Sequence, residues 1–88
     1  MKKLNEMTLN ELLFELKDVH HYNYVDDIVN IKVFSKFKTD SRLICEVYDP
    51  KFMGEYLLEQ TIRSYNIALD YKDSFDNMHV ELKICINI

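Results

Sequence analysis

Glycine and proline are nearly absent from this chain, which contains one of each among its 88 residues. Glycine-rich turns are what allow a backbone to cradle phosphate groups or to approach a dinucleotide closely. The sequence accordingly has no Walker loop and no dinucleotide-binding fingerprint, and it also lacks the HExxH pattern of zinc peptidases. The same shortage argues against long flexible linkers. We therefore expect one ordered domain spanning residues 1–88.

Cysteine is also scarce, and its spacing argues against a disulfide framework. Cys45 and Cys85 lie far apart, each within a strand-like run, whereas small secreted domains usually carry more cysteines at closer spacings. No apolar run is long enough to span a membrane, and the basic residues 1–3 lead into polar residues rather than into a signal sequence. These features predict free thiols and a cytoplasmic location.

Patterns that support catalysis or metal binding are missing as well. No serine lies in a nucleophile elbow or beside a glycine-rich oxyanion loop. The neighbours His20 and His21 cannot present both rings from one face of a helix. Asp26 and Asp27 are more typical of a solvated turn than of a magnesium site, because no phosphate-binding feature accompanies them. We expect no enzyme activity, no metal and no cofactor.

A first helix is predicted from a clear start signal. Thr8 and Glu11 match the capping box, in which each side chain accepts a hydrogen bond from a backbone N–H at the helix start. One apolar stripe follows at helical spacing: Leu9, Leu12, Leu13, Leu16 and Val19. We expect the last turn at His20 and His21, where a partly cationic imidazole is favoured by the helix dipole.

A two-stranded hairpin is predicted between Asp27 and Asp49. Residues 29–37 alternate in polarity, as expected of a strand with one face in a core and one face in water. A turn at residues 38–41 follows, and residues 43–47 resume the period of two. This hairpin also carries the only local excess of positive charge in the sequence.

The second half of the chain begins with another helix signal. Asp49 and Pro50 are a capping residue and a proline at the first helical position, which predicts a helix reaching about residues 60–63. The stretch Tyr65–Tyr71 alternates as a strand does, although its apolar residues also fit a continuation of the helix; we prefer the strand. After a polar turn, residues 80–88 show the cleanest strand alternation in the sequence.

The predicted order αββαββ indicates an α+β, two-layer sandwich in which two helices cover one face of a four-stranded antiparallel sheet. It corresponds to the ferredoxin-like order βαββαβ with its first strand moved to the end. In this permuted ferredoxin-like arrangement the second and fourth strands are central, and the lysines of the first strand protect an edge. If the last strand, ending at Ile88, lay at an edge instead, it would offer a homodimer interface.

Acidic residues are the most informative surface feature. The net charge is −4, which argues against a general nucleic-acid binder. Carboxylates line the exposed side of the predicted first helix and continue beyond it, with tyrosines nearby. The predicted partner-binding residues are Glu11, Glu15, Asp18, Tyr22, Tyr24, Asp26 and Asp27. A row of carboxylates attracts and orients a basic groove, and tyrosines are enriched at protein interfaces.

In size and composition, the whole chain resembles the small acidic proteins encoded by phages, among them anti-CRISPR proteins and DNA mimics. Proteins of that kind bind a host nucleic-acid-handling protein and block its charged groove. The resemblance implies a non-enzymatic protein-binding inhibitor that acts on a host defence or nucleic-acid-handling protein in the host-cell cytoplasm.

The alternative function is a small nucleic-acid-binding regulator that uses the basic hairpin. Cations beside an aromatic ring on an exposed strand face can contact phosphates and stack on a base. The residues of this alternative site are Lys32, Phe34, Lys36, Lys38 and Arg42. The protection of an edge strand by lysine explains the same residues, so we favour the protein partner over direct nucleic-acid binding.

Overall fold

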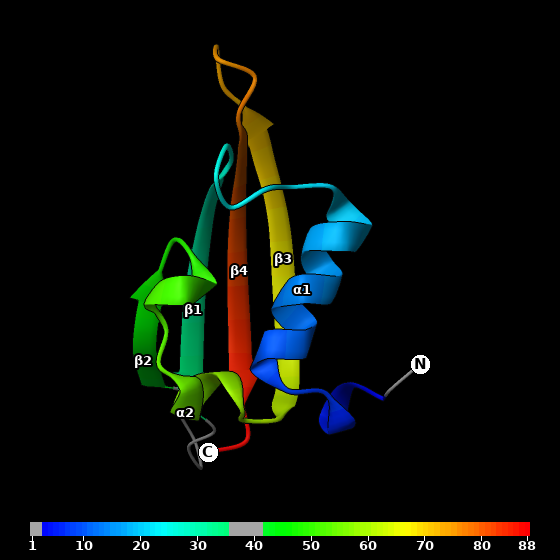
Figure 1. Ribbon diagram of the computed structural model, residues 1–88, viewed down its shortest axis with the longest axis vertical. Helices are drawn as coiled ribbons and strands as arrows, with labels where there is room; N and C mark the ends of the chain where they lie inside the picture. The colour runs from blue at the N-terminus through cyan, green and yellow to red at the C-terminus, as the bar shows by residue number, and fades with distance from the viewer. Residues whose placement is uncertain (1–2, 36–41) are drawn as a thin grey trace.

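The computed structural model describes residues 3–35 and 42–88. The helical segments α1, η2 and α2 lie on one face of a four-stranded sheet (Figure 1), which confirms the predicted α+β class. Here η denotes a 3-10 helix. In chain order the elements are η1 (Leu4–Glu6), α1 (Leu9–His20), β1 (Ile28–Ser35), β2 (Arg42–Val47), η2 (Pro50–Phe52), α2 (Glu55–Leu58), β3 (Ile62–Lys72) and β4 (Met78–Ile86).

The sheet is mixed, with the strand order β2-β1-β4-β3. Each hairpin, β1–β2 and β3–β4, pairs antiparallel, whereas the two central strands β1 and β4 run parallel. The prediction of a wholly antiparallel sheet was therefore wrong. The expected positions were wrong too, because β1 rather than β2 is central, so the strand order is not that of the permuted ferredoxin-like arrangement.

Burial explains why β1 occupies the centre. Its residues Val29, Ile31 and Val33 are completely buried, while no residue of β2 is buried. In the central pair Val29 lies opposite Val80, and Ile31 lies opposite Leu82. Joining the hairpins through their two most apolar strands removes the largest apolar area from water.

The first helix follows its sequence signals at both ends. The Thr8 Oγ1 accepts a hydrogen bond from the Glu11 N–H at 3.2 Å, and the Glu11 carboxylate accepts one from the Thr8 N–H at 3.1 Å. At the other end, α1 stops at His20, and His21 adopts a left-handed backbone with φ 57°. Four leucines of the predicted stripe are buried, but Val19 is exposed. The predicted helix is thus confirmed, and its buried stripe is one residue shorter than expected.

The second predicted helix is broken into two short pieces. Asp49 and Pro50 do start a helical turn, since the Asp49 carboxylate accepts a hydrogen bond from the Lys51 N–H at 3.0 Å. The backbone then becomes extended at Met53 and Gly54, so the continuous helix to residues 60–63 was wrong. The break places the Met53 side chain in the core, where it is buried. The strand preferred for Tyr65–Tyr71 is confirmed as part of β3.

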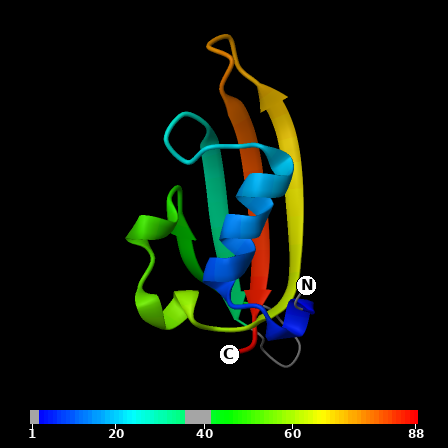
Figure 2. The ribbon, with the colours of Figure 1, turned by 45° about the vertical axis from the view of Figure 1, so that its right-hand side comes forward.

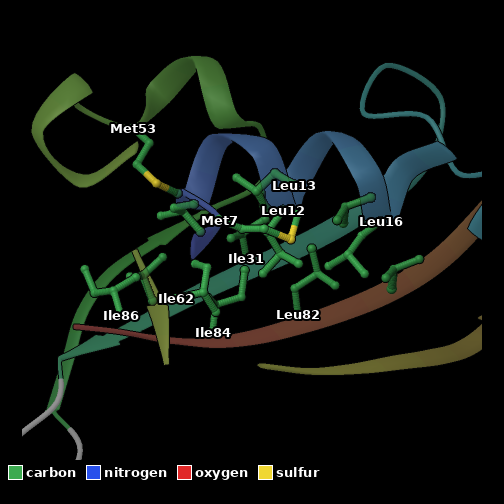
Figure 3. Packing of buried hydrophobic residues seen from close by; sticks show 14 of the residues in the cluster. Met7, Leu12, Leu13, Leu16, Ile31, Met53, Ile62, Leu82, Ile84 and Ile86 are labelled. Carbon is green, nitrogen blue, oxygen red and sulfur yellow. The ribbon is translucent and has the colours of Figure 1, made fainter. Parts of the chain in front are cut away.

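The core lies between α1 and the central strands (Figure 3). The α1 leucines point toward the branched side chains of β1 and β4, and Met7, Met53 and Ile62 close the end near α2. None of the described helices covers the opposite face of the sheet, which carries the alternate residues of all four strands. We call this surface the open face.

Two tyrosines anchor the connection from α1 to β1, and only one of them has a partner for its hydroxyl. Tyr22 is 2% exposed, and its hydroxyl makes no hydrogen bond of good geometry among the described residues, although its pKa, raised by burial, is raised further by the nearby Tyr24 side chain. Tyr24 packs edge-on against it, with ring centroids 5.5 Å apart, and donates to the Leu13 carbonyl at 3.2 Å. Burial raises the pKa of both side chains. Tyr22 therefore belongs to the core rather than to an exposed interface.

This difference predicts opposite effects for two matched substitutions. Tyr22→Phe removes a buried hydroxyl without a partner, so we expect it to be neutral or to stabilise by up to about 1 kcal/mol. Tyr24→Phe removes a hydrogen bond, so it should cost about 1 kcal/mol. Urea unfolding followed by circular dichroism measures both, and an equal loss of stability in the two variants would contradict this account.

Candidate functional site

The predicted acidic line on α1 is only partly available to a partner. The Glu11 carboxylate is engaged in the helix cap, whereas Glu15 is half-buried and Asp18 is exposed. Phe14 lies on the same outer side of the helix, by its spacing to Glu11 and Asp18. Its side chain is 63% exposed, and the Lys17 ammonium lies 5.7 Å from the ring centroid. Phe14 was not among the predicted site residues. Its exposure could have been inferred from the sequence, because Phe14 falls outside the leucine stripe.

The two adjacent acids after α1 have different roles. One oxygen of the Asp27 carboxylate accepts a hydrogen bond from the Asn23 N–H at 2.7 Å, and the other accepts one from the Met78 N–H at 2.8 Å. Asp27 thus ties the connection to the start of β4. Asp26 is exposed, and its carboxylate oxygen is 3.4 Å from the Asn23 amide nitrogen. Of the pair, Asp26 is the residue that a partner can reach.

We use the term acidic face for Phe14, Glu15 and Asp18 of α1 together with Asp26 of the connection that follows. Figure 1 shows that this connection leaves the end of α1 and crosses the sheet toward β1. The remaining residues of the predicted site, Glu11, Tyr22, Tyr24 and Asp27, are engaged in the contacts described above. The structure thus separates the predicted residues into an exposed group and a group that holds the fold.

Near the acidic face, the β3–β4 turn presents an exposed aromatic side chain. The Asp73 carboxylate accepts hydrogen bonds from the Asn77 and Phe75 N–H groups and lies 3.1 Å from the His79 Nε2. The hydrogen bond from Asn77, followed by those from His79 and Phe75, lowers the pKa of Asp73. Tyr71 stacks on the His79 ring at 4.2 Å. This ordered turn displays Phe75 at the same end of the molecule as the α1–β1 connection (Figures 1 and 2).

The residues of the alternative nucleic-acid site are only partly brought together. Lys32 and Phe34 lie on the open face of β1, opposite Lys83 and Cys85 of β4. Arg42 starts β2 and is exposed. Lys36 and Lys38 fall outside the described residues.

Acidic side chains accompany the open-face lysines. Glu46 lies opposite Lys32 across the β1–β2 pair, and its carboxylate accepts a hydrogen bond from the Asn30 amide at 2.9 Å. The Lys83 ammonium lies 3.3 Å from the Glu81 carboxylate. Cations and anions therefore alternate across the open face, so its described part does not form a uniformly basic stripe.

The structure also describes the two thiols and the side chains that could bind a metal ion. Cys45 and Cys85 are both free, as predicted, and burial raises the pKa of Cys45. Within residues 3–35 and 42–88, no three His, Cys, Asp or Glu side chains are grouped so that they could hold a metal ion. None of the helices in this part of the chain has both the length and the apolar character needed to cross a membrane.

Comparisons of the chain with protein-family models, with curated proteins and with solved structures gave no significant match.

The neighbours Asp26 and Asp27 supply a test of the site. Asp27→Ala removes two charge-assisted hydrogen bonds, so we expect it to cost about 2 kcal/mol of stability and to loosen the α1–β1 connection. Asp26→Ala should change stability by less than about 0.5 kcal/mol. Chemical denaturation measures the stability, and amide hydrogen exchange at Met78 reports the lost contact. Equal effects of the two substitutions would show that Asp27 does not anchor the connection.

Proposed function

We propose that this protein is a non-catalytic, protein-binding inhibitor that uses the acidic face to occupy a basic groove on its target. The observation that carries the proposal is an exposed aromatic ring, Phe14, one helical turn before the exposed Asp18 on the outer side of α1, with Glu15 on the flank of the helix toward β3. In size and composition the chain resembles the small acidic phage-encoded proteins of the anti-CRISPR kind, and we propose for it the same class of target, a host defence or nucleic-acid-handling protein.

The chemistry of the acidic face favours a protein partner with arginine and lysine side chains. Carboxylates steer a basic surface into contact and fix its register. A large aromatic side chain supplies affinity when it enters a pocket from which water is excluded, and such anchors contribute most of the binding free energy in many interfaces. Phe14 with its acidic neighbours combines both requirements on one rigid helix.

The proposed target class follows from the same charges. Proteins that handle nucleic acids contain grooves rich in lysine and arginine that neutralise phosphates. A row of carboxylates competes for these side chains, and occupation of the groove blocks the nucleic acid. Because the acidic face also contains an apolar ring, the surface fits a groove with an adjacent apolar pocket better than it imitates a whole duplex.

The proposal is tested with variants of α1 that keep the fold. Phe14, Glu15 and Asp18 make no contact that the core needs, so Phe14→Ala and the double reversal Glu15→Lys/Asp18→Lys should both fold. We expect each to weaken partner binding about tenfold or more. The assay is capture of host proteins from a bacterial lysate on the immobilised protein, with quantification by mass spectrometry and titration of the captured protein.

A matched control separates the acidic face from the overall charge. The double reversal Glu55→Lys/Glu59→Lys makes the same change of charge at exposed positions around α2. It should retain the protein captured by the wild type. If the α1 variants and the control capture that protein equally well, the acidic face is not the binding surface.

A second candidate function, nucleic-acid binding, is favoured by one specific observation. The parallel register sets Lys32 directly opposite Lys83. A phosphate bound between them would contact both ammonium groups, in competition with the Glu46 and Glu81 carboxylates that already lie beside them. Phe34 lies on the same side of β1 and offers a ring for base stacking.

This second candidate predicts retarded migration of a single-stranded oligonucleotide at low salt, with an affinity that falls as salt rises. Lys32→Glu/Lys83→Glu should abolish the retardation, whereas Lys17→Glu/Lys51→Glu, a matched change on the helical side, should not. An electrophoretic mobility assay at several salt concentrations measures this. Unretarded oligonucleotide at the lowest salt concentration rules the function out.

A further inference from the structure

The proposed function does not use the outer edge of the long strand β3. β3 spans 11 residues, whereas β2, at the other edge, spans 6. Among residues 3–35 and 42–88, contacts cover the outer edge of β3 at its beginning: the Ile62 N–H donates to the Met7 carbonyl at 3.1 Å, and Thr8 forms a bridge with Thr61. Beyond that point, no strand in the described part of the chain pairs with the outer edge of β3 (Figure 2).

The direction of the Ile62 N–H identifies the backbone groups on this edge. Because that N–H points to Met7 and away from β4, the opposed pair Ile62 and Ile86 is of the non-hydrogen-bonded kind. Hydrogen-bonded and non-hydrogen-bonded pairs alternate along an antiparallel ladder, and β4 is regular over this stretch. Residues opposite Ile84, Leu82 and Val80 therefore also direct their N–H and C=O groups outward. These residues are Tyr65, Ile67 and Leu69.

The side chains of the same three residues form an incompletely covered apolar row. They point to the helical side of the sheet, yet Tyr65 is 41% exposed and Leu69 is 49% exposed. Val19 of α1 is also exposed beside them. A groove between α1 and β3 lies beside Tyr65, the one residue of this row in its lining, and is closed by Leu4 and Met7 before α1 and by Leu12, Leu16 and Val19 of α1. Free backbone groups and exposed apolar side chains thus coincide along one edge.

We propose that a second copy of this chain pairs with β3 along this edge, strand to strand and antiparallel, about a two-fold axis at Ile67. In this register Ile67 faces Ile67 of the second copy, and Tyr65 faces Leu69 of the second copy. All three outward residues then form hydrogen-bonded pairs, so every free backbone group between Tyr65 and Leu69 gains a partner. The apolar row of each copy is extended across the interface by that of the other, and the two sheets become one.

Charge favours a second copy over an unrelated peptide strand. Arg63 and Asp70 are both exposed and lie at opposite ends of the pairing segment. Antiparallel pairing about Ile67 sets Arg63 of one copy opposite Tyr71 of the other, and Asp70 of that copy opposite Ser64. β3 has a register irregularity at both Arg63 and Asp70, so the two charges fall on neighbouring pairs at each end of the interface. Opposite charges across a strand pair are stabilising. The segment is therefore self-complementary, with apolar residues in the middle and opposite charges at its ends.

The first test measures oligomeric state by sedimentation equilibrium over a range of protein concentration. We expect the wild type to form a dimer and Leu69→Lys to be monomeric, because an ammonium group would then face the apolar row of the second copy. Ile44→Lys is the matched control, since Ile44 is 40% exposed on the other edge strand, and it should remain dimeric. Far-ultraviolet circular dichroism of the monomeric variant verifies that it is folded.

A charge exchange tests the register. Arg63→Asp and Asp70→Arg each place like charges at both ends of the interface, so each should raise the dimer dissociation constant about tenfold. The double variant restores opposite charges and should recover the wild-type constant. A wild type that stays monomeric at the highest concentration overturns the proposal, even if its edge captures an unrelated peptide. Loss of the dimer in Ile44→Lys but not in Leu69→Lys, or no recovery in the double variant, also overturns it.

Discussion

The parallel pairing of β1 with β4 is the constraint on which the rest of this structure depends. It places the completely buried residues of both strands next to each other, with Val33 opposite Ile84. The leucines of α1 pack against the surface that this pair creates. The pairing also decides which strands are left at the edges, so the open backbone of β3 and the short, exposed β2 are both consequences of it.

Local signals were sufficient to predict the first helix and the four strands, but not the second helix or the arrangement of the strands. The capping box of Thr8 and Glu11 and the period-two runs correctly indicated one helix and four strands, because these patterns depend on neighbouring residues. Alternation reveals which side of a strand is buried, but it does not reveal which strand lies beside it. The second helix failed for a related reason: the burial of Met53 by the core outweighed the local helical pattern.

The candidate site shows the same division between local and distant information. Asp26 and Asp27 are adjacent and chemically identical in the sequence, and they differ because Asp27 accepts hydrogen bonds from the Asn23 N–H and from the Met78 N–H, 51 positions along the chain. Tyr22 and Tyr24 are separated by burial in the same way. Phe14, in contrast, was missing from the predicted site, although an apolar residue outside the leucine stripe is a signal that the sequence contains. The acidic face could therefore be located from sequence, but its members could not be told apart from residues that hold the fold.

The topology also determines the order in which the molecule can fold. Each hairpin closes a short stretch of chain, and such elements form within microseconds. Joining β1 to β4 must instead bring together residues about fifty positions apart, so the associated loss of chain entropy precedes any gain from the shared core. The hydrogen bonds of Asp27 to Asn23 and Met78 link the starts of these two strands. The contact between Asp27 and Met78 shortens the chain loop that the rest of the β1–β4 pairing must close. It also favours the observed register over registers in which β1 and β4 are shifted along each other.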